Sequence, residues 1–135
     1  MKSRKDLINC LKKRDILNNN GIDGGVLIEY GTGFVEMELF NDAIDFFEKA
    51  NYEDGLKEIK NTAIESGDLF LYRRCCKALN IKENKKELKK LAENAGKTGK
   101  LLFASQAYSL LGDKERAQEF IEQLSYHGQI AADTK

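Results

Sequence analysis

Residues 39–50 read LFNDAIDFFEKA, and residues 111–124 read LGDKERAQEFIEQL. Both stretches begin with a turn, continue through an alanine and an aromatic residue, and finish on small or apolar residues. A shift of 74 residues aligns Ala43 with Ala117 and Phe46 with Phe120. The sequence therefore contains two copies of one helical unit, with few reactive side chains in either copy. We expect its function to come from the surfaces that repeated helices form.

The alignment continues upstream, where it places Phe34 on Tyr108 and Leu27 on Leu101. Apolar residues in these stretches recur every three or four positions, which is the period of an amphipathic helix. The chain has 135 residues, 41% of them hydrophobic, and contains no proline, which favours helices over a sandwich or barrel. The sequence predicts one all-α domain over residues 1–124, followed by a flexible tail over 125–135. Eight helices are expected, at about 3–18, 25–38, 42–50, 53–66, 69–79, 84–95, 98–111 and 113–124.

These stretches resemble the tetratricopeptide repeat, which pairs an aromatic residue late in its first helix with Gly, Ala and an aromatic residue around its second. GFVEMELFNDAIDFFEKA and AYSLLGDKERAQEFIEQL carry the resemblance. Two positions depart from it: Glu38 replaces the turn glycine, and Tyr72 occupies the position of the small residue. The resemblance implies a right-handed superhelix of antiparallel helical hairpins, an α-solenoid with irregular repeats.

Such an array implies a concave surface, lined by the first helix of each hairpin, that holds a peptide or helix of a partner. The polar residues expected there are Thr32, Lys57, Asn61 and Gln106. Some members of the family bind peptide carboxylates through Lys and Asn on these helices, but here only Lys57 and Asn61 are of those types. The chaperone-tail activity of those members is therefore not expected.

The formal net charge is zero but unevenly distributed. Residues 21–72 carry three basic and twelve acidic side chains, whereas residues 73–100 carry ten basic and three acidic ones. The basic segment either is a solvated face that pairs with the chain's own acidic block or attracts an acidic protein. Nucleic acid is less favoured, because the segment lacks interleaved exposed aromatic residues for base stacking. The basic patch comprises Arg73, Arg74, Lys77, Lys85, Lys86, Lys89 and Lys90.

Apparent catalytic and ligand-binding motifs are incomplete. AGKTGK at 95–100 resembles the end of a phosphate-binding loop, but Leu91 stands where that loop needs glycine, so an interhelical turn is expected. NNNGIDGG at 18–25 lacks the calcium-loop glycine, because Asp23 occupies its position. His127 is the one histidine and falls in the expected tail, where no catalytic set surrounds it.

The three cysteines, Cys10, Cys75 and Cys76, match no metal or disulfide framework and indicate reduced thiols in a cytoplasmic protein. No apolar run is long enough to span a membrane or to act as a signal peptide. The sequence thus predicts a protein–protein interaction module, without enzymatic activity or cofactor. The alternatives are an RNA-binding or enzyme-accessory protein that uses the basic segment, or a subunit of a larger α-solenoid assembly. The oligomeric state is left open.

Overall fold

In the computed structural model, residues 10–133 are described, and every regular element among them is an α-helix. The predicted all-α class and the predicted number of helices are confirmed over this range. The predicted start of the first helix, at Ser3, lies outside the described residues. The helices are α1 Cys10–Asn18, α2 Gly24–Glu36, α3 Phe40–Lys49, α4 Glu53–Ser66, α5 Leu69–Leu79, α6 Lys85–Lys97, α7 Leu101–Leu110 and α8 Lys114–Asp133.

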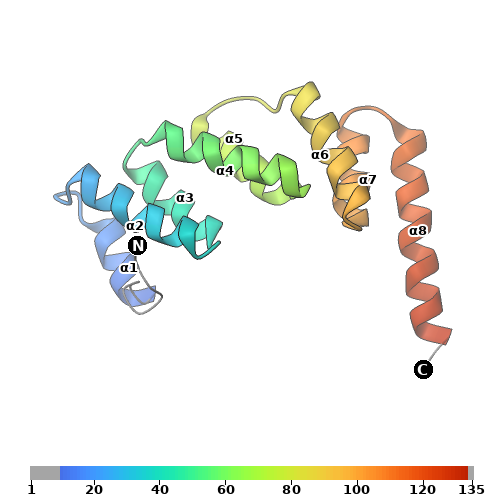
Figure 1. Cartoon of the computed structure of the whole chain (residues 1–135), viewed down its shortest axis with the longest axis horizontal. Helices are drawn as coiled ribbons and strands as arrows, with labels where there is room; N and C mark the ends of the chain where they lie inside the picture. The colour runs from blue at the N-terminus through green and yellow to red at the C-terminus, as the bar shows by residue number, and fades with distance from the viewer. Residues whose placement is uncertain (1–9, 134–135) are drawn as a thin grey trace.

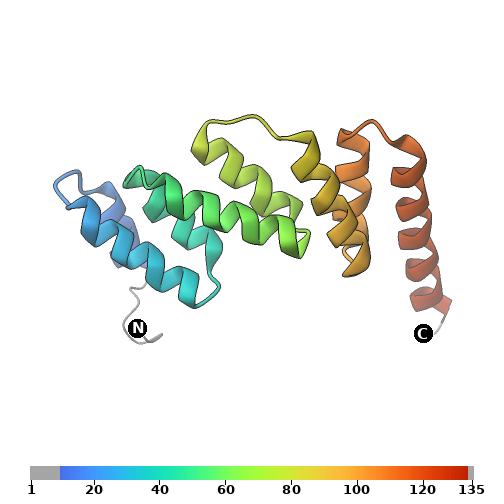
Figure 2. The ribbon, with the colours of Figure 1, turned by 45° about the horizontal axis from the view of Figure 1, so that its top comes forward.

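The helices follow one another in an arched row, with the two ends of the chain at opposite ends of the molecule (Figures 1 and 2). Consecutive helices pack against each other in the pairs α2–α3, α4–α5, α6–α7 and α7–α8. Contacts between pairs define two layers, because α4 packs against α6 while α5 packs against both α3 and α7. None of the described helices is long and apolar enough to cross a membrane.

The links from α2 onward share one turn geometry. In each, a residue one or two positions after the end of the helix has a positive φ, and the next amide donates to a carbonyl five residues back, as in the Schellman motif. For example, Gly112 has a φ of 82°, and the Asp113 amide donates to the Tyr108 carbonyl at 2.9 Å. The same turn thus reverses the chain six times. The positive-φ residues are Glu38, Asn51, Gly67, Asn80, Gly99 and Gly112.

The aligned aromatic residues make equivalent contacts in the two pairs α2–α3 and α7–α8. Phe34 stacks on Phe46 with ring centroids 5.5 Å apart, and Tyr108 stacks on Phe120 at 5.7 Å. Ala43 and Ala117, one turn earlier on α3 and α8, are both buried. In each pair a small residue lets the second helix approach the first, and the stacked rings fill the space beside it.

Phe47 joins α2, α3 and α4. A Cβ atom added at Gly31 would lie 2.4 Å from its ring, and one added at Gly55 would lie 2.7 Å from it. The ring therefore occupies space that any larger residue on α2 or α4 would need. These two glycines allow the close approach of three helices around one buried aromatic side chain.

The structure shows why the bulky Tyr72 occupies a position where the repeat pattern has a small residue. Its side chain is fully buried, and its hydroxyl accepts a hydrogen bond from the Asn84 amide at 3.0 Å and donates one to Glu87 at 3.1 Å. Glu87 also pairs with Lys60, with Nζ and Oε2 3.0 Å apart. The bulky residue thus reaches beyond its own helical pair and ties α4, α5 and α6 together.

Two predicted boundaries are wrong. Helix α6 continues to Lys97, and Thr98 caps its end with a hydroxyl that donates to the Asn94 carbonyl at 2.8 Å. Helix α7 therefore begins at Leu101 rather than at Thr98. Helix α8 continues past Leu124 to Asp133, because no proline interrupts it and the helix needs no neighbour to satisfy its own backbone hydrogen bonds. The predicted tail begins inside this helix, and its flexibility stays a prediction.

Candidate functional site

A hollow of about 960 Å³ lies between α3 and α5. Ile44 on α3 and Cys76 on α5 are buried at its lining, whereas Phe70 is exposed at its edge. The link between α5 and α6 closes one side with Ile81 and Lys82. The first hollow therefore combines an apolar lining with cationic side chains, because Arg73, Arg74 and Lys77 also line it.

A second hollow, of about 650 Å³, lies over α7 between α5 and α8. On the α5 side, the second hollow is lined by Arg73, which also lines the first hollow. Its α7 side is mainly polar, with Ser105 and Gln106, while Leu110 and Ile121 supply apolar surface. Because Arg73 borders both, the two hollows form one continuous surface across α3, α5, α7 and α8, which we call the two-hollow face.

Exposed apolar side chains concentrate on this face. Of the nine large hydrophobic residues that are exposed in the described part of the chain, four line the hollows: Phe70, Ile81, Leu110 and Ile121. Phe70 is 66% exposed, the largest exposed fraction among the nine. Single exposed apolar residues are ordinary, but a cluster bordered by polar groups is typical of an interaction site.

Internal ion pairs neutralise part of the positive charge. The Arg73 Nε lies 2.7 Å from a carboxylate oxygen of Glu83. Arg74 donates to the carbonyl and side-chain oxygens of Asn41, at 2.9 and 2.8 Å, and to Asp45. Arg74 with Asp45 therefore pairs the basic segment with the acidic block, whereas Glu83 belongs to the basic segment itself. Three lysines of the two-hollow face make no ion pair with any described residue: Lys77, Lys82 and Lys114.

Asp45 also binds the first helix of the described chain. Lys13 on α1 lies 2.7 Å from Asp42 and 2.7 Å from Asp45. Partial burial lowers the pKa of Lys13, but the hydrogen bonds and charges of the two aspartates outweigh it and raise the pKa overall. Asp45 thus bridges α1 and α5 and holds Arg74, which lines the first hollow.

The structure divides the predicted basic patch into two. Arg73, Arg74 and Lys77 belong to the two-hollow face, whereas the four other members lie on α6. Those four, Lys85, Lys86, Lys89 and Lys90, are exposed. Lys86 and Lys90 border a smaller hollow of about 330 Å³ between α4 and α6.

The structure separates one of the predicted groove residues, Gln106, from the others. Thr32 is exposed on α2 and Lys57 on α4, where Lys57 lies 3.9 Å from Glu53. Asn61 borders the small hollow between α4 and α6, whereas Gln106 lines the second hollow on α7. The extra helix α6 causes this separation, because it shifts α7 into the layer of α3 and α5. Gln106 alone of the four lies on the two-hollow face.

The remaining motifs have structural roles. Cys75 and Cys76 are free and buried; burial raises the pKa of Cys75 to about 12 and also raises that of Cys76. Lys97 and Thr98 form the C-terminal end of α6, the end of a helix that repels anions, as expected for an interhelical turn. The side chains of Cys10 and His127 lie outside the described residues.

Sequence reasoning missed Phe70, although a signal for it exists. The buried residues of α5 are Leu69, Leu71, Tyr72, Cys75 and Cys76. Successive helical residues are about 100° apart, so Phe70 falls opposite the centre of this buried stripe. An apolar residue on the polar side of an otherwise complete helix is the pattern that predicts an exposed aromatic side chain.

No protein-family model matches the chain, and neither a curated protein nor a solved structure matches it.

Proposed function

We propose that this chain is a protein-binding adaptor, and that it docks its partner on the two-hollow face. In this proposal the helices form a short, irregular array of tetratricopeptide-like hairpins, wound as a right-handed superhelix. The repeated turn geometry and the two equivalent aromatic stacks support that view. Arrays of this kind present extended surfaces from several helices at once, which suits the recognition of a peptide or helix.

The observation that carries the proposal is the position of Phe70. It is the most exposed of the large hydrophobic residues in the described chain, and it lines the first hollow. Covering one such aromatic side chain contributes about 2 kcal/mol to binding, by the usual relation of free energy to apolar area. Aromatic and arginine side chains are also the residue types that dominate binding energy at protein interfaces, and Arg73 lies one turn away on the same helix.

RNA binding is the second candidate, because the structure adds an exposed aromatic residue to the basic segment. Phe70 lies beside Arg73 and Lys77 along α5, and the lysines of α6 are exposed. Base stacking on an aromatic ring beside cations is a common mode of single-strand recognition. This candidate predicts an affinity that falls steeply with salt concentration, since phosphate binding releases counterions.

Site-specific photo-crosslinking tests the proposal. A photoreactive phenylalanine analogue is placed at Phe70, at Leu110 or at Val26, which is 40% exposed on α2 and lies outside the two-hollow face. In extracts of the source cells, positions 70 and 110 should cross-link to the same protein, and position 26 should not. Cross-linking to RNA at positions 70 and 110, or an identical protein profile from all three positions, would contradict the proposal.

A further inference from the structure

We infer that the partner segment bound by the two-hollow face is acidic, with a bulky apolar side chain on each side of its central carboxylate. In this arrangement the two apolar side chains enter the two hollows and the carboxylate meets Arg73 between them. The inference rests on the proposed function, because it names the partner chemistry of the same face.

Arg73 is the central residue, since it alone lines both hollows among the residues that the structure describes. Its side chain is 54% exposed, and its Nε holds Glu83. A guanidinium group has five N–H donors in one plane, so the group retains donors for a second carboxylate. A bound segment that crosses from one hollow to the other has to pass this group.

The charges around Arg73 favour an acidic segment. The first hollow is lined by Arg74, Lys77 and Lys82 in addition to Arg73, against Glu48 and Glu83. The second hollow is lined by Lys114 and Arg73 and by no carboxylate. Asp45 already neutralises Arg74, which leaves the lysines to attract the partner. Complementary charge of this kind raises association rates and fixes the orientation of a bound chain.

The apolar residues stand on both sides of Arg73. Phe70 and Ile81 belong to the first hollow, and Leu110 and Ile121 to the second. In the second hollow, the Ser109 hydroxyl and the Gln118 amide provide hydrogen-bond donors and acceptors for a peptide backbone. A nucleic acid would instead need a row of cations, and the exposed lysines of α6 are not part of the lining of this face.

Glu83 competes with the proposed ligand, because its carboxylate occupies Arg73 at 2.7 Å in the structure. Removal of that charge frees the guanidinium group without changing the size of the side chain. Glu83→Gln is therefore expected to strengthen binding of an acidic segment, whereas Arg73→Gln weakens it. The two substitutions change charge in opposite directions at one contact.

Selection from a random peptide library displayed on phage tests the inference with the whole chain as bait. We compare the peptides that bind the wild-type protein with those that bind the Phe70→Ser variant. The peptides that bind only the wild-type protein should be enriched in Asp or Glu and in Phe, Leu or Ile. The tightest peptide is then labelled and its affinity measured by fluorescence anisotropy. Arg73→Gln should weaken it about tenfold or more, and Glu83→Gln should strengthen it severalfold. Lys89→Gln, an exposed lysine on α6, is the matched control and should change the affinity less than about twofold.

Three results would overturn the inference. Peptides that require Phe70 but show no acidic enrichment contradict it and leave the proposed function intact. Equal affinities for wild type and Arg73→Gln contradict the central role of Arg73. A labelled uridine 20-mer that binds through Arg73 and competes with the peptides would assign the face to RNA. Failure of the proposed function is seen separately, as the absence of specific protein cross-links at positions 70 and 110.

Discussion

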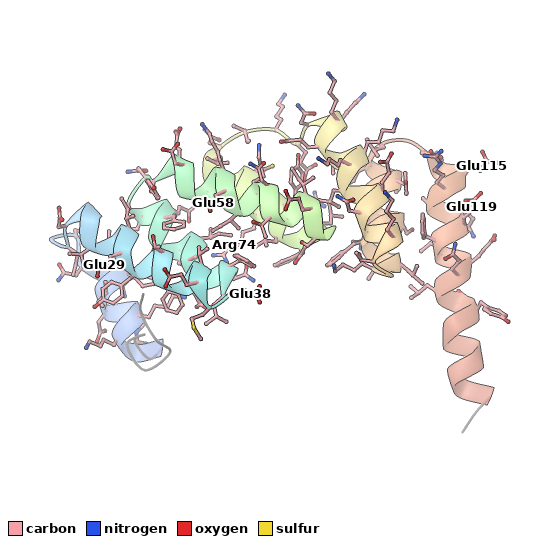
Figure 3. All side chains as sticks on the ribbon, viewed as in Figure 1. Glu29, Glu38, Glu58, Arg74, Glu115 and Glu119 are labelled. Atoms are coloured by element: carbon pink, nitrogen blue, oxygen red, sulfur yellow. The ribbon has the colours of Figure 1, made fainter. Side chains whose placement is uncertain are left out.

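Glu38 occupies a turn position where three of the other links have glycine, and its φ is 58°. A side chain in this left-handed region crowds the backbone, which is why the position favours glycine. The side chain is exposed and lies at the turn between α2 and α3 (Figure 3). The chain therefore carries local strain at one of the turns that reverse it.

Glu38→Gly should stabilise the fold by about 1 kcal/mol, because the relief of a left-handed side chain exceeds the added freedom of glycine in the unfolded chain. The measurement is the urea midpoint followed by circular dichroism. Glu58→Gly is the matched control, since Glu58 is exposed in the interior of α4, where glycine should cost about 1 kcal/mol. Destabilisation by both substitutions would show that the turn carries no strain.

The buried thiols predict a loss of stability at alkaline pH. Burial raises the pKa of Cys75 from 9.0 to about 12, so the folded chain keeps a proton that the unfolded chain releases. Stability should be constant below about pH 8 and should then fall as pH rises; for each such thiol the slope reaches about half of 1.4 kcal/mol per pH unit at pH 9 and the full value about one unit higher. Urea unfolding at pH 8.0, 9.0 and 9.5 measures this slope.

The control for this titration is the double change Cys75→Ala and Cys76→Ala. It lowers the overall stability but should make the dependence on pH shallower over the same interval, because it removes both thiols whose pKa burial raises. An unchanged slope in the double variant would assign the alkaline loss to other groups. Tyr72 is one of these, since burial raises its pKa as well.

Among the helices, α6 is the element whose position depends most on one side chain. The Tyr72 hydroxyl links the amide at its N-cap, Asn84, to Glu87 in its first turn. At its other end, the Asn94 side chain donates to the Ile64 carbonyl at 2.9 Å and so covers the end of α4. Polar contacts at both ends therefore hold α6 against α4 and α5.

Tyr72→Phe should cost about 1 to 2 kcal/mol, because it leaves two part-buried hydrogen-bonding groups without their partner. Amide exchange should also accelerate at Asn84, and that local change separates loss of the link from general destabilisation. Tyr108→Phe is the control, since the structure shows no hydrogen bond from the Tyr108 hydroxyl and its ring would still stack on Phe120. Equal effects of the two substitutions would contradict the role of the Tyr72 hydroxyl.

Helix period and turn residues were enough to predict the number of helices, and of the aligned residues Ala43, Ala117, Phe34, Phe46 and Tyr108 are buried, whereas Phe120 is only partly buried. The sequence could not show which layer each helix joins, because that depends on contacts between helices far apart in the chain. Gln106 illustrates this: its helix was expected to line the same surface as Lys57, and α6 moves it to the other layer. The hollows were unpredictable for the same reason, since residues of two helices and a link line the first hollow and residues of three helices line the second.

At the scale of the whole molecule, the side of α8 that faces away from α7 differs in character from the two-hollow face. The outer side of α8 carries Glu115 and Glu119, which point away from α7 (Figure 3). The two-hollow face, by contrast, gathers from α5, α7, α8 and the link between α5 and α6 exposed apolar residues and lysines that make no ion pair with any described residue. This contrast leads us to assign partner binding to that face.

Nuclear magnetic resonance mapping of the bound partner segment tests this assignment most directly. The labelled protein is titrated with the peptide that the selection yields, or with the segment that cross-links at position 70. The account predicts the largest amide and methyl shift changes at Phe70, Arg73, Leu110 and Ile121, on both sides of the boundary between the hollows. Changes centred instead on Thr32, Lys57 and Asn61, with the two-hollow face unaffected, would contradict it.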